Sequence, residues 1–190
     1  AFESMSKKIS DLIHEMVDKV RVDQELAIAK TVQQSLFPPA QIQNNHLNLH
    51  SHYQSASECG GDWWGYFQVG NKHVMAIADA TGHGLPSALM TASARSCFSV
   101  IEKLALDESF GLDPSLMLSI ANRVVYDSAQ GKIMMTCLVC VLDFDQHTIT
   151  YASAAHNPAW LFTPTGDGKS KLASLVSKGE RLGERQEVSE

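Results

Sequence analysis

The chain has 190 residues, 44% of them hydrophobic, and a formal net charge of −6 at pH 7. This length and composition predict one globular domain with an appendage and a sizeable buried core. The negative charge argues against a general nucleic-acid-binding protein. No apolar run in the sequence is long enough to cross a bilayer.

The first predicted element is one long helix over residues 2–36, a stretch without glycine or proline. Apolar residues recur at coiled-coil spacing in its first half, at Met5, Ile9, Leu12 and Met16. The pattern then slips, because Lys19 and Asp23 occupy the next positions. Two explanations stay open: packing on the helix's own domain, or pairing of two copies into a homodimer. The chain begins within this helix without an initiator methionine, so we expect a segment of a longer protein.

A Pro-Pro pair at 38–39 ends the helix. Residues 47–53 begin with alternating character and predict a strand. His46, His50 and His52 would share its polar face and could bind a metal if they converged. Alternate residues on a strand lie about 6.5–7 Å apart, so we interpret these histidines as an exposed polar face and predict no zinc site.

Residues 63–69 and 74–78 predict two strands joined by a turn that contains Gly-Asn. Because a hairpin brings the start of its first strand beside the end of its second, we expect Asp62 and Asp79 to lie side by side. Two adjacent carboxylates repel each other unless a proton or a cation lies between them. Their oxygens suit Mg²⁺ or Mn²⁺. The alternative for Asp79 is a structural turn or capping residue.

A glycine-rich loop at residues 80–84 follows Asp79 and leads into a helix predicted at 85–104, with Pro86 in its first turn. Glycines allow backbone carbonyls and amides to approach an ion or a phosphate closely. A nucleotide-binding P-loop is excluded because no Lys-Ser/Thr pair follows the glycines.

A second helix is predicted from Asp113, as N-cap, to about Ala129. Further strands are predicted at 133–144, 148–153, 159–163 and 171–176. Sequential strands with short turns are antiparallel. Since the two helices are consecutive and do not alternate with strands, the fold class is α+β with a sandwich-like core.

Four cysteines are scattered along the chain, at Cys59, Cys97, Cys137 and Cys140. The last two form a C-x-x-C pair within a predicted strand, where a spacing of three places them on opposite faces. We therefore expect no redox or zinc role and interpret the cysteines as packed thiols in a reducing cytoplasm.

Four blocks of sequence together resemble the SpoIIE-type branch of the metal-dependent serine/threonine phosphatases, the PPM or protein phosphatase 2C-like superfamily. In chain order they are ELAIAKTVQQSLFPP at 25–39, GGDWW at 60–64, IADATGHG at 77–84 and AAHNP at 154–158. The resemblance covers about residues 25–183. It implies stacked antiparallel β-sheets flanked by helices and preceded by a long N-terminal helix, a signalling linker at 1–37 and a phosphatase domain at 38–190 that lacks its C-terminal part.

The resemblance also implies a site for two Mn²⁺ or Mg²⁺ ions. Asp79 would be the bridging ligand with the Ala80 carbonyl beside it, and Asp62 would bind one ion directly or through its water. His83 is a candidate acid or phosphate neighbour. The turn at 155–157, with His156 and Asn157, is expected to fix a bend near the site.

The sequence departs from the family pattern in three ways. Two further acidic ligands, one of them in a Thr-Asp-Gly block, do not occur, and Asp167 in a predicted turn is a poor substitute. Ala155 replaces a glycine, and Gly65 stands where many members carry another aspartate. We therefore predict weak metal binding and little or no turnover for residues 1–190 alone.

The implied function is dephosphorylation of phosphoserine or phosphothreonine in a bacterial anti-anti-sigma (STAS) protein during stress signalling by partner switching. An upstream sensor domain in the same chain would regulate it through the linker helix. The alternative is a catalytically silent phosphatase-fold module that binds or dimerises. Intact Asp62 and Asp79 favour the enzyme, and the missing acidic ligands favour the silent module.

Overall fold

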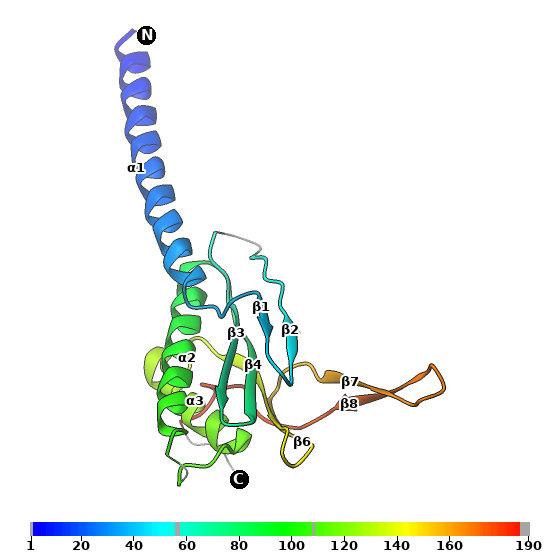
Figure 1. Ribbon diagram of the computed structural model, residues 1–190. Helices are drawn as coiled ribbons and strands as arrows, with labels where there is room; N and C mark the ends of the chain where they lie inside the picture. Colours follow the sequence, from blue (N-terminus) through cyan, green and yellow to red (C-terminus); the bar gives the residue numbers. More distant parts are fainter. Residues whose placement is uncertain (1, 56–57, 108, 187–190) are drawn as a thin grey trace.

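The structure is a computed structural model that describes residues 2–55, 58–107 and 109–186 (Figure 1). It confirms the predicted α+β class, with antiparallel sheets, two packed helices and a long N-terminal helix. The helices are α1 (Phe2–Gln34), α2 (Leu85–Leu104) and α3 (Pro114–Ala129). The strands are β1 (Gln41–Gln43), β2 (Asn48–His50), β3 (Asp62–Val69), β4 (Lys72–Ala80), β5 (Met135–Asp143), β6 (Thr148–Ala154), β7 (Ala159–Pro164) and β8 (Ser170–Leu175).

The centre of the fold is a four-stranded antiparallel sheet in the order β3-β4-β5-β6. One face is buried against α2 and α3, which also pack on each other. The core on this face is apolar and includes Trp63, Val74, Ala78, Val139 and Met117. Trp63 packs against Phe98 of α2 with ring centroids 5.2 Å apart. This face accounts for the alternation of buried residues along β3 and β4.

Both packed helices begin and end where the sequence predicts. The Asp113 side chain accepts a hydrogen bond from the Ser115 backbone N–H at 2.8 Å and so caps α3. At the other end, Gln130 takes a left-handed conformation with φ 50°. Helix α2 begins after Gly84, whose φ of 76° turns the chain sharply out of the loop that follows β4.

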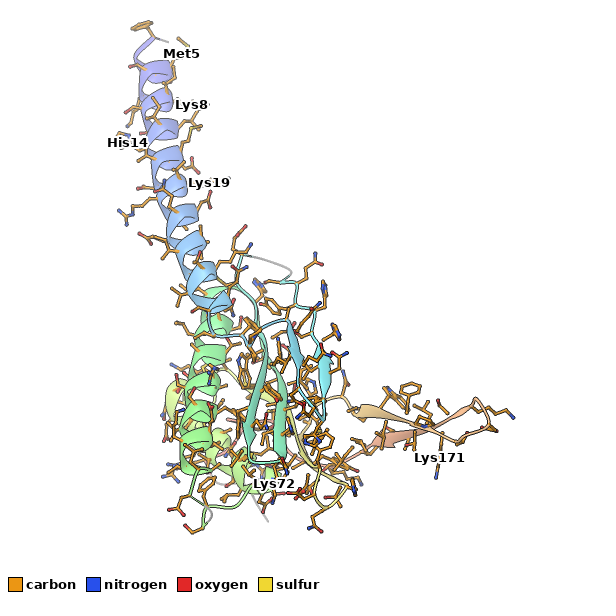
Figure 2. The ribbon with its side chains drawn as sticks, viewed as in Figure 1. Met5, Lys8, His14, Lys19, Lys72 and Lys171 are labelled. Atoms are coloured by element: carbon orange, nitrogen blue, oxygen red, sulfur yellow. The ribbon has the colours of Figure 1, made fainter. Side chains whose placement is uncertain are left out.

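Helix α1 extends away from the domain, and only its last turns contact it (Figure 1). Its apolar residues from Phe2 to Val22 are at least half exposed. Figure 2 shows Met5, His14 and Lys19 projecting away from the folded body. Packing on the chain's own domain therefore does not account for the apolar spacing of the first half of the helix.

The β1–β2 hairpin covers part of the second face of the sheet. The strand predicted at 47–53 is confirmed only for Asn48–His50. The side chain of Asn44 accepts hydrogen bonds from the backbone N–H groups of His46 and Leu47, at 3.0 and 2.8 Å, and closes the turn. His46 then stacks on Phe144, with ring centroids 5.0 Å apart.

His46, His50 and His52 are exposed. Within the described part of the chain no group of three or more His, Cys, Asp or Glu side chains could hold a metal ion. The exposure of the three histidines agrees with their interpretation as polar surface residues.

The β7–β8 hairpin projects from the body beyond the four-stranded sheet (Figure 1). Its two strands pair with each other. Asp167 lies in its tip, where its carboxylate accepts a hydrogen bond from the Lys169 backbone N–H and from the Thr165 hydroxyl. None of the described helices is both long enough and apolar enough to span a membrane.

The cysteines lie as predicted. All four are buried. Cys137 belongs to the core under the helices, with a pKa held far above its usual range by burial. Cys140 lies on the other face of β5, opposite Met75 of β4. The C-x-x-C spacing therefore does not bring two thiols together.

Candidate active site

The predicted hairpin places Asp62 and Asp79 side by side. Asp62, the first residue of β3, is the register partner of Asp79 near the end of β4. Cross-strand partners share a face of the sheet, with Cβ atoms about 4.5–5.5 Å apart. Both residues are exposed, on the face opposite the helices. The strand pairing thus forms a two-carboxylate edge at one rim of the sheet.

The surroundings of Asp79 disfavour its charged form. Burial of the carboxyl raises the pKa of Asp79, and the neighbouring Asp62 charge and hydrogen bond raise it further. Nearby His156 lowers the pKa of Asp79, but by less than these effects raise it. A cation between the two oxygens would remove the repulsion that causes part of the shift.

The approach of Gly61 to Ala80 shapes the backbone at this rim. The Ala80 N–H donates to the Gly61 carbonyl at 3.0 Å. A Cβ added at Gly61 would lie 2.6 Å from the Ala80 carbonyl oxygen. The Ala80 carbonyl oxygen therefore lies closely against Gly61, where only glycine fits without displacing it. Ala80 itself is buried, at 2% exposure.

The loop after Ala80 is tied to β5 and then opens toward solvent. The Thr81 N–H donates to the Met134 carbonyl at 2.8 Å, and the Met134 N–H donates to the Thr81 hydroxyl at 3.0 Å. Beyond it, Gly82 adopts φ 92°. His83 is exposed, and its side chain makes no hydrogen bond or ion pair with the residues that the structure describes. His83 follows Asp79 by four residues, and its exposed ring is available for other contacts.

A row of polar side chains continues from the two aspartates across the sheet. Thr136 of β5 is the register partner of Asp79. The Thr136 hydroxyl lies 2.7 Å from Nδ1 of His156. Burial lowers the pKa of His156, and the charges of Asp79 and Asp62 oppose that effect. His156 therefore lies within electrostatic range of both carboxylates.

The turn at 154–158 is strained at one residue. Ala155 adopts φ 53°, a left-handed conformation that favours glycine, which the related motif carries at this position. Gly65 lies on the helix-facing side, where an added Cβ would meet the Trp63 ring at 2.5 Å. An acidic side chain at position 65 would therefore point into the core and away from the rim.

The buried side chain of Gln33 connects the last turn of the N-terminal helix to the segment before Asp62. An exposed ion pair, Lys30 with Glu58, joins the same two segments. Gln33, at 5% exposure, donates from Nε2 to the Gly60 carbonyl at 2.6 Å and to the Thr91 hydroxyl of α2 at 3.1 Å. The Gly60 N–H in turn donates to Gln33 Oε1 at 3.2 Å. The last turn of α1 is thus bonded to both the segment that leads into Asp62 and the helix that follows the Asp79 loop.

The sequence also matches a known protein family. Residues 70–188 match the family model for stage II sporulation protein E (SpoIIE). The chain belongs to the SpoIIE family. The match covers the Asp79 loop, both packed helices and the His156 turn, and the Asp62 strand lies just before it.

Two curated relatives of this SpoIIE-family chain come from Bacillus subtilis (strain 168). The chain is 30% identical over 168 residues to "Phosphoserine phosphatase RsbU", covering 87% of this chain and 47% of RsbU. It is 29% identical over 147 residues to "Phosphoserine phosphatase RsbP", covering 74% of this chain and 34% of RsbP. The chain therefore spans about half or less of the length of these relatives.

The fold is that of a PP2C domain. The SiaA-PP2C domain of Pseudomonas aeruginosa superposes with a TM-score of 0.67 at 20% identity, covering 89% of this chain and 65% of that one. At this identity the likeness establishes the fold alone.

Two residues that contact the rim carry no motif of their own. Thr136 would be found from the sequence only by aligning the predicted strands in antiparallel register, which places it opposite Asp79. Gln33 lies in the block at 25–39, but nothing in its local sequence shows that its amide is buried.

Proposed function

We propose that the chain carries part of the catalytic site of a metal-dependent protein phosphatase that acts on phosphoserine or phosphothreonine. The observation that carries the proposal is the register pairing of Asp62 with Asp79, with the Ala80 carbonyl on the next residue of the chain. Three oxygen donors of this kind match the preferences of Mg²⁺ and Mn²⁺.

The residues present fit one half of a dinuclear centre. Asp79 would bridge two ions, the Ala80 carbonyl would bind beside it, and Asp62 would bind one ion directly or through water. In the part of the chain that the structure describes, no third His, Cys, Asp or Glu side chain joins the two aspartates to make a group that could hold a metal ion. The remaining acidic ligands of a dinuclear centre are therefore not among the described residues. Asp167 is held in the tip of the β7–β8 hairpin and does not replace them.

When bound, the ions would activate water and neutralise charge on the transferred phosphoryl group. The chain's own contribution is positional. Asp62 and Asp79 must both be ionised to bind cations, which the raised pKa of Asp79 opposes in the metal-free protein. Gly61 leaves room for the Ala80 carbonyl oxygen in its present position. His83, exposed in the following loop, is the proposed acid or phosphate neighbour.

The names of the two relatives support the substrate class, since both are phosphoserine phosphatases. We propose a phosphorylated STAS-domain protein as the partner, within bacterial stress signalling by partner switching in the cytoplasm. The test is release of phosphate from such a protein. Mn²⁺ or Mg²⁺ should support turnover by the whole protein, and chelation should abolish it. Phosphate release that survives chelation would contradict the proposal.

Regulation through the linker is the second part of the proposal. We divide the chain into a linker at 1–37 and a phosphatase domain from 38 onward. Gln33 is the only residue of α1 whose side chain is bonded to both the Gly60 backbone and α2 in the described contacts. Movement of α1 by an upstream sensor domain would pull on the segment before Asp62 and on the helix after the Asp79 loop together.

The exposed apolar stripe of α1 supports a homodimer. Met5, Ile9, Leu12 and Met16 are each at least 50% exposed, at the spacing of a coiled-coil seam. A second copy of the helix would cover them. Sedimentation should show a dimer that Leu12→Asp dissociates while the domain stays folded. A protein that is monomeric at micromolar concentration would contradict the dimer.

The alternative remains a silent phosphatase-fold module. Its specific support is that the described residues supply only two carboxylates to the rim. Reading the gene beyond the codon for Glu190 separates the two candidates. A Thr-Asp-Gly block followed by a further aspartate would supply the remaining ligands and favour the enzyme.

A further inference from the structure

The polar row on the open face of the sheet has four members. Asp62, Asp79 and Thr136 are successive register partners on β3, β4 and β5, and their side chains share one face. His156, just after β6, joins the row through the Thr136 hydroxyl at 2.7 Å. The row therefore runs from the two carboxylates to an imidazole, with a hydroxyl between them.

The imidazole is held from several sides. Its Nδ1 atom is occupied by Thr136. The His156 N–H donates to the Ser153 hydroxyl at 3.1 Å, and that hydroxyl donates to the His156 carbonyl at 3.3 Å. A parallel bridge ties Ala155 to Cys137, the residue after Thr136. With the backbone and Nδ1 fixed, Nε2 is the only polar atom of the ring left to act on another group.

A purely structural role for His156 would explain the bonded backbone but not the orientation of the ring. A turn needs only the Ser153 bonds and the left-handed Ala155. The Thr136 bond lies outside the turn and attaches the ring to β5. What it does is hold the half-buried ring at the sheet face, within electrostatic range of both aspartates.

We propose that Thr136 is a positioning residue that fixes the His156 ring so that Nε2 contacts a phosphoryl oxygen of the substrate. Phosphoryl oxygens are strong acceptors, and a donor beside two cation-binding carboxylates offers a fixed contact on the remaining side of the phosphate. The inference rests on the proposed phosphatase function and adds a substrate contact to it. The proposal includes the tautomer in which the Thr136 hydroxyl donates to Nδ1 and Nε2 carries the proton. It involves no new bond-making step, because Nε2–H only donates a hydrogen bond.

The test compares Thr136→Val with Thr136→Ser in the whole protein. Valine keeps the shape and the strand preference but removes the hydroxyl, while serine keeps the hydroxyl. We expect Thr136→Val to lower kcat/KM for a phosphorylated protein by about tenfold, because a misplaced contact group loses much of its effect. Thr136→Ser should retain most of the activity, and Mn²⁺ affinity should be unchanged in both variants. Equal kcat/KM for wild type and Thr136→Val would overturn the proposal and leave the phosphatase function standing.

A second measurement does not depend on turnover. Ring ¹⁵N signals of His156 report its tautomer, and inorganic phosphate with Mg²⁺ serves as the probe. We expect the Nε2 signal to shift on adding phosphate in wild type and in Thr136→Ser, and to shift much less in Thr136→Val. If the wild-type Nε2 signal did not shift when phosphate binds, the proposed contact would be overturned. If wild type binds Mg²⁺ but neither binds phosphate nor hydrolyses the phosphoprotein, the proposed function fails together with this contact.

Discussion

The two-carboxylate rim and the N-terminal helix are held in opposite ways. The rim is fixed by a ladder of register pairs across three strands, with its buried face under α2 and α3. The helix leaves the body with its apolar side chains exposed and is bonded to the rim's entry segment through Gln33. Under the proposed function, the rigid part would set the geometry of the metal site, and the loosely attached helix would change that geometry.

The largest expected effect comes from the rim itself. Asp79→Asn removes the proposed bridging charge and should lower metal-dependent phosphate release by at least about a hundredfold. Asp62→Asn should have a smaller effect, because Asp62 would bind one ion only. Asp127→Asn, which alters an exposed ion pair with Arg123, is the control and should leave activity unchanged. If Asp79→Asn were about as active as the control variant, Asp79 would not be part of the catalytic site.

The second-largest expected effect concerns the Ala80 carbonyl oxygen, the proposed backbone ligand. Gly61→Ala places a methyl group 2.6 Å from the Ala80 carbonyl oxygen, too close to be accepted without movement. We expect loss of about 1–3 kcal/mol of folding stability and a Mn²⁺ affinity about tenfold weaker as the carbonyl is displaced. Chemical denaturation and calorimetric titration measure the two effects. Unaltered Mn²⁺ affinity in a folded variant would exclude the Ala80 carbonyl as a ligand.

Loss of the Gln33 contact between α1 and the segment before Asp62 should have an intermediate effect on stability and regulation. Gln33→Ala leaves the Gly60 N–H and carbonyl without their side-chain partner and should cost about 1–3 kcal/mol of stability. In the whole protein it should also reduce the response of activity to the upstream signal.

The neighbouring Gln34 is exposed and provides the matched control, since Gln34→Ala removes an amide from the same helical turn without touching the rim. Ala27→Pro, which breaks α1 above this turn, should likewise uncouple the signal while sparing the metal ligands. A signal response that is intact in both Gln33→Ala and Ala27→Pro would contradict coupling through α1.

The smallest effect concerns pH. Because the folded protein raises the pKa of Asp79, this group's contribution to stability is present at acidic pH and is lost as pH rises through the raised value. Without metal, Asp79→Asn should be more stable than wild type near pH 7. The difference should be about 0.5 kcal/mol, since solvent screens an exposed carboxylate, and should vanish on acidification.

Thermal unfolding of both proteins between about pH 4 and pH 7 measures this difference. Taking the difference between the two proteins removes the opposing contributions of Asp107, Asp143, Asp167 and Glu184, whose pKa values are lowered by hydrogen bonds. Wild type that is more stable than Asp79→Asn at neutral pH without metal would show that the two carboxylates do not repel.

Local signals in the sequence were sufficient to predict the central hairpin and both packed helices. Glycines, prolines and Asp113 mark their ends, and alternation marks their buried faces. The side-by-side placement of Asp62 and Asp79 follows from the hairpin alone. The short β1–β2 pair was predicted only in part, because strands of three residues show no clear period and the turn depends on the Asn44 side chain.

Other features depend on contacts between distant parts of the chain. The Thr136–His156 bond needs β5, β6 and the turn after them to be assembled first. The Gln33 amide becomes informative only once α1 meets Gly60 and Thr91. The departure at position 65 has a reason visible only in the structure, where that residue faces the Trp63 ring.

The most direct test is calorimetric titration of Mn²⁺ into residues 1–190 and into the Asp62→Asn, Asp79→Asn and double variants. We predict weak binding by wild type, weaker binding by each single variant, and a loss in the double variant that is smaller than the sum of the two single losses, because the two carboxylates hold the same ion. Equal Mn²⁺ affinity in all four proteins, or losses that simply add, would contradict a shared cation site at this rim.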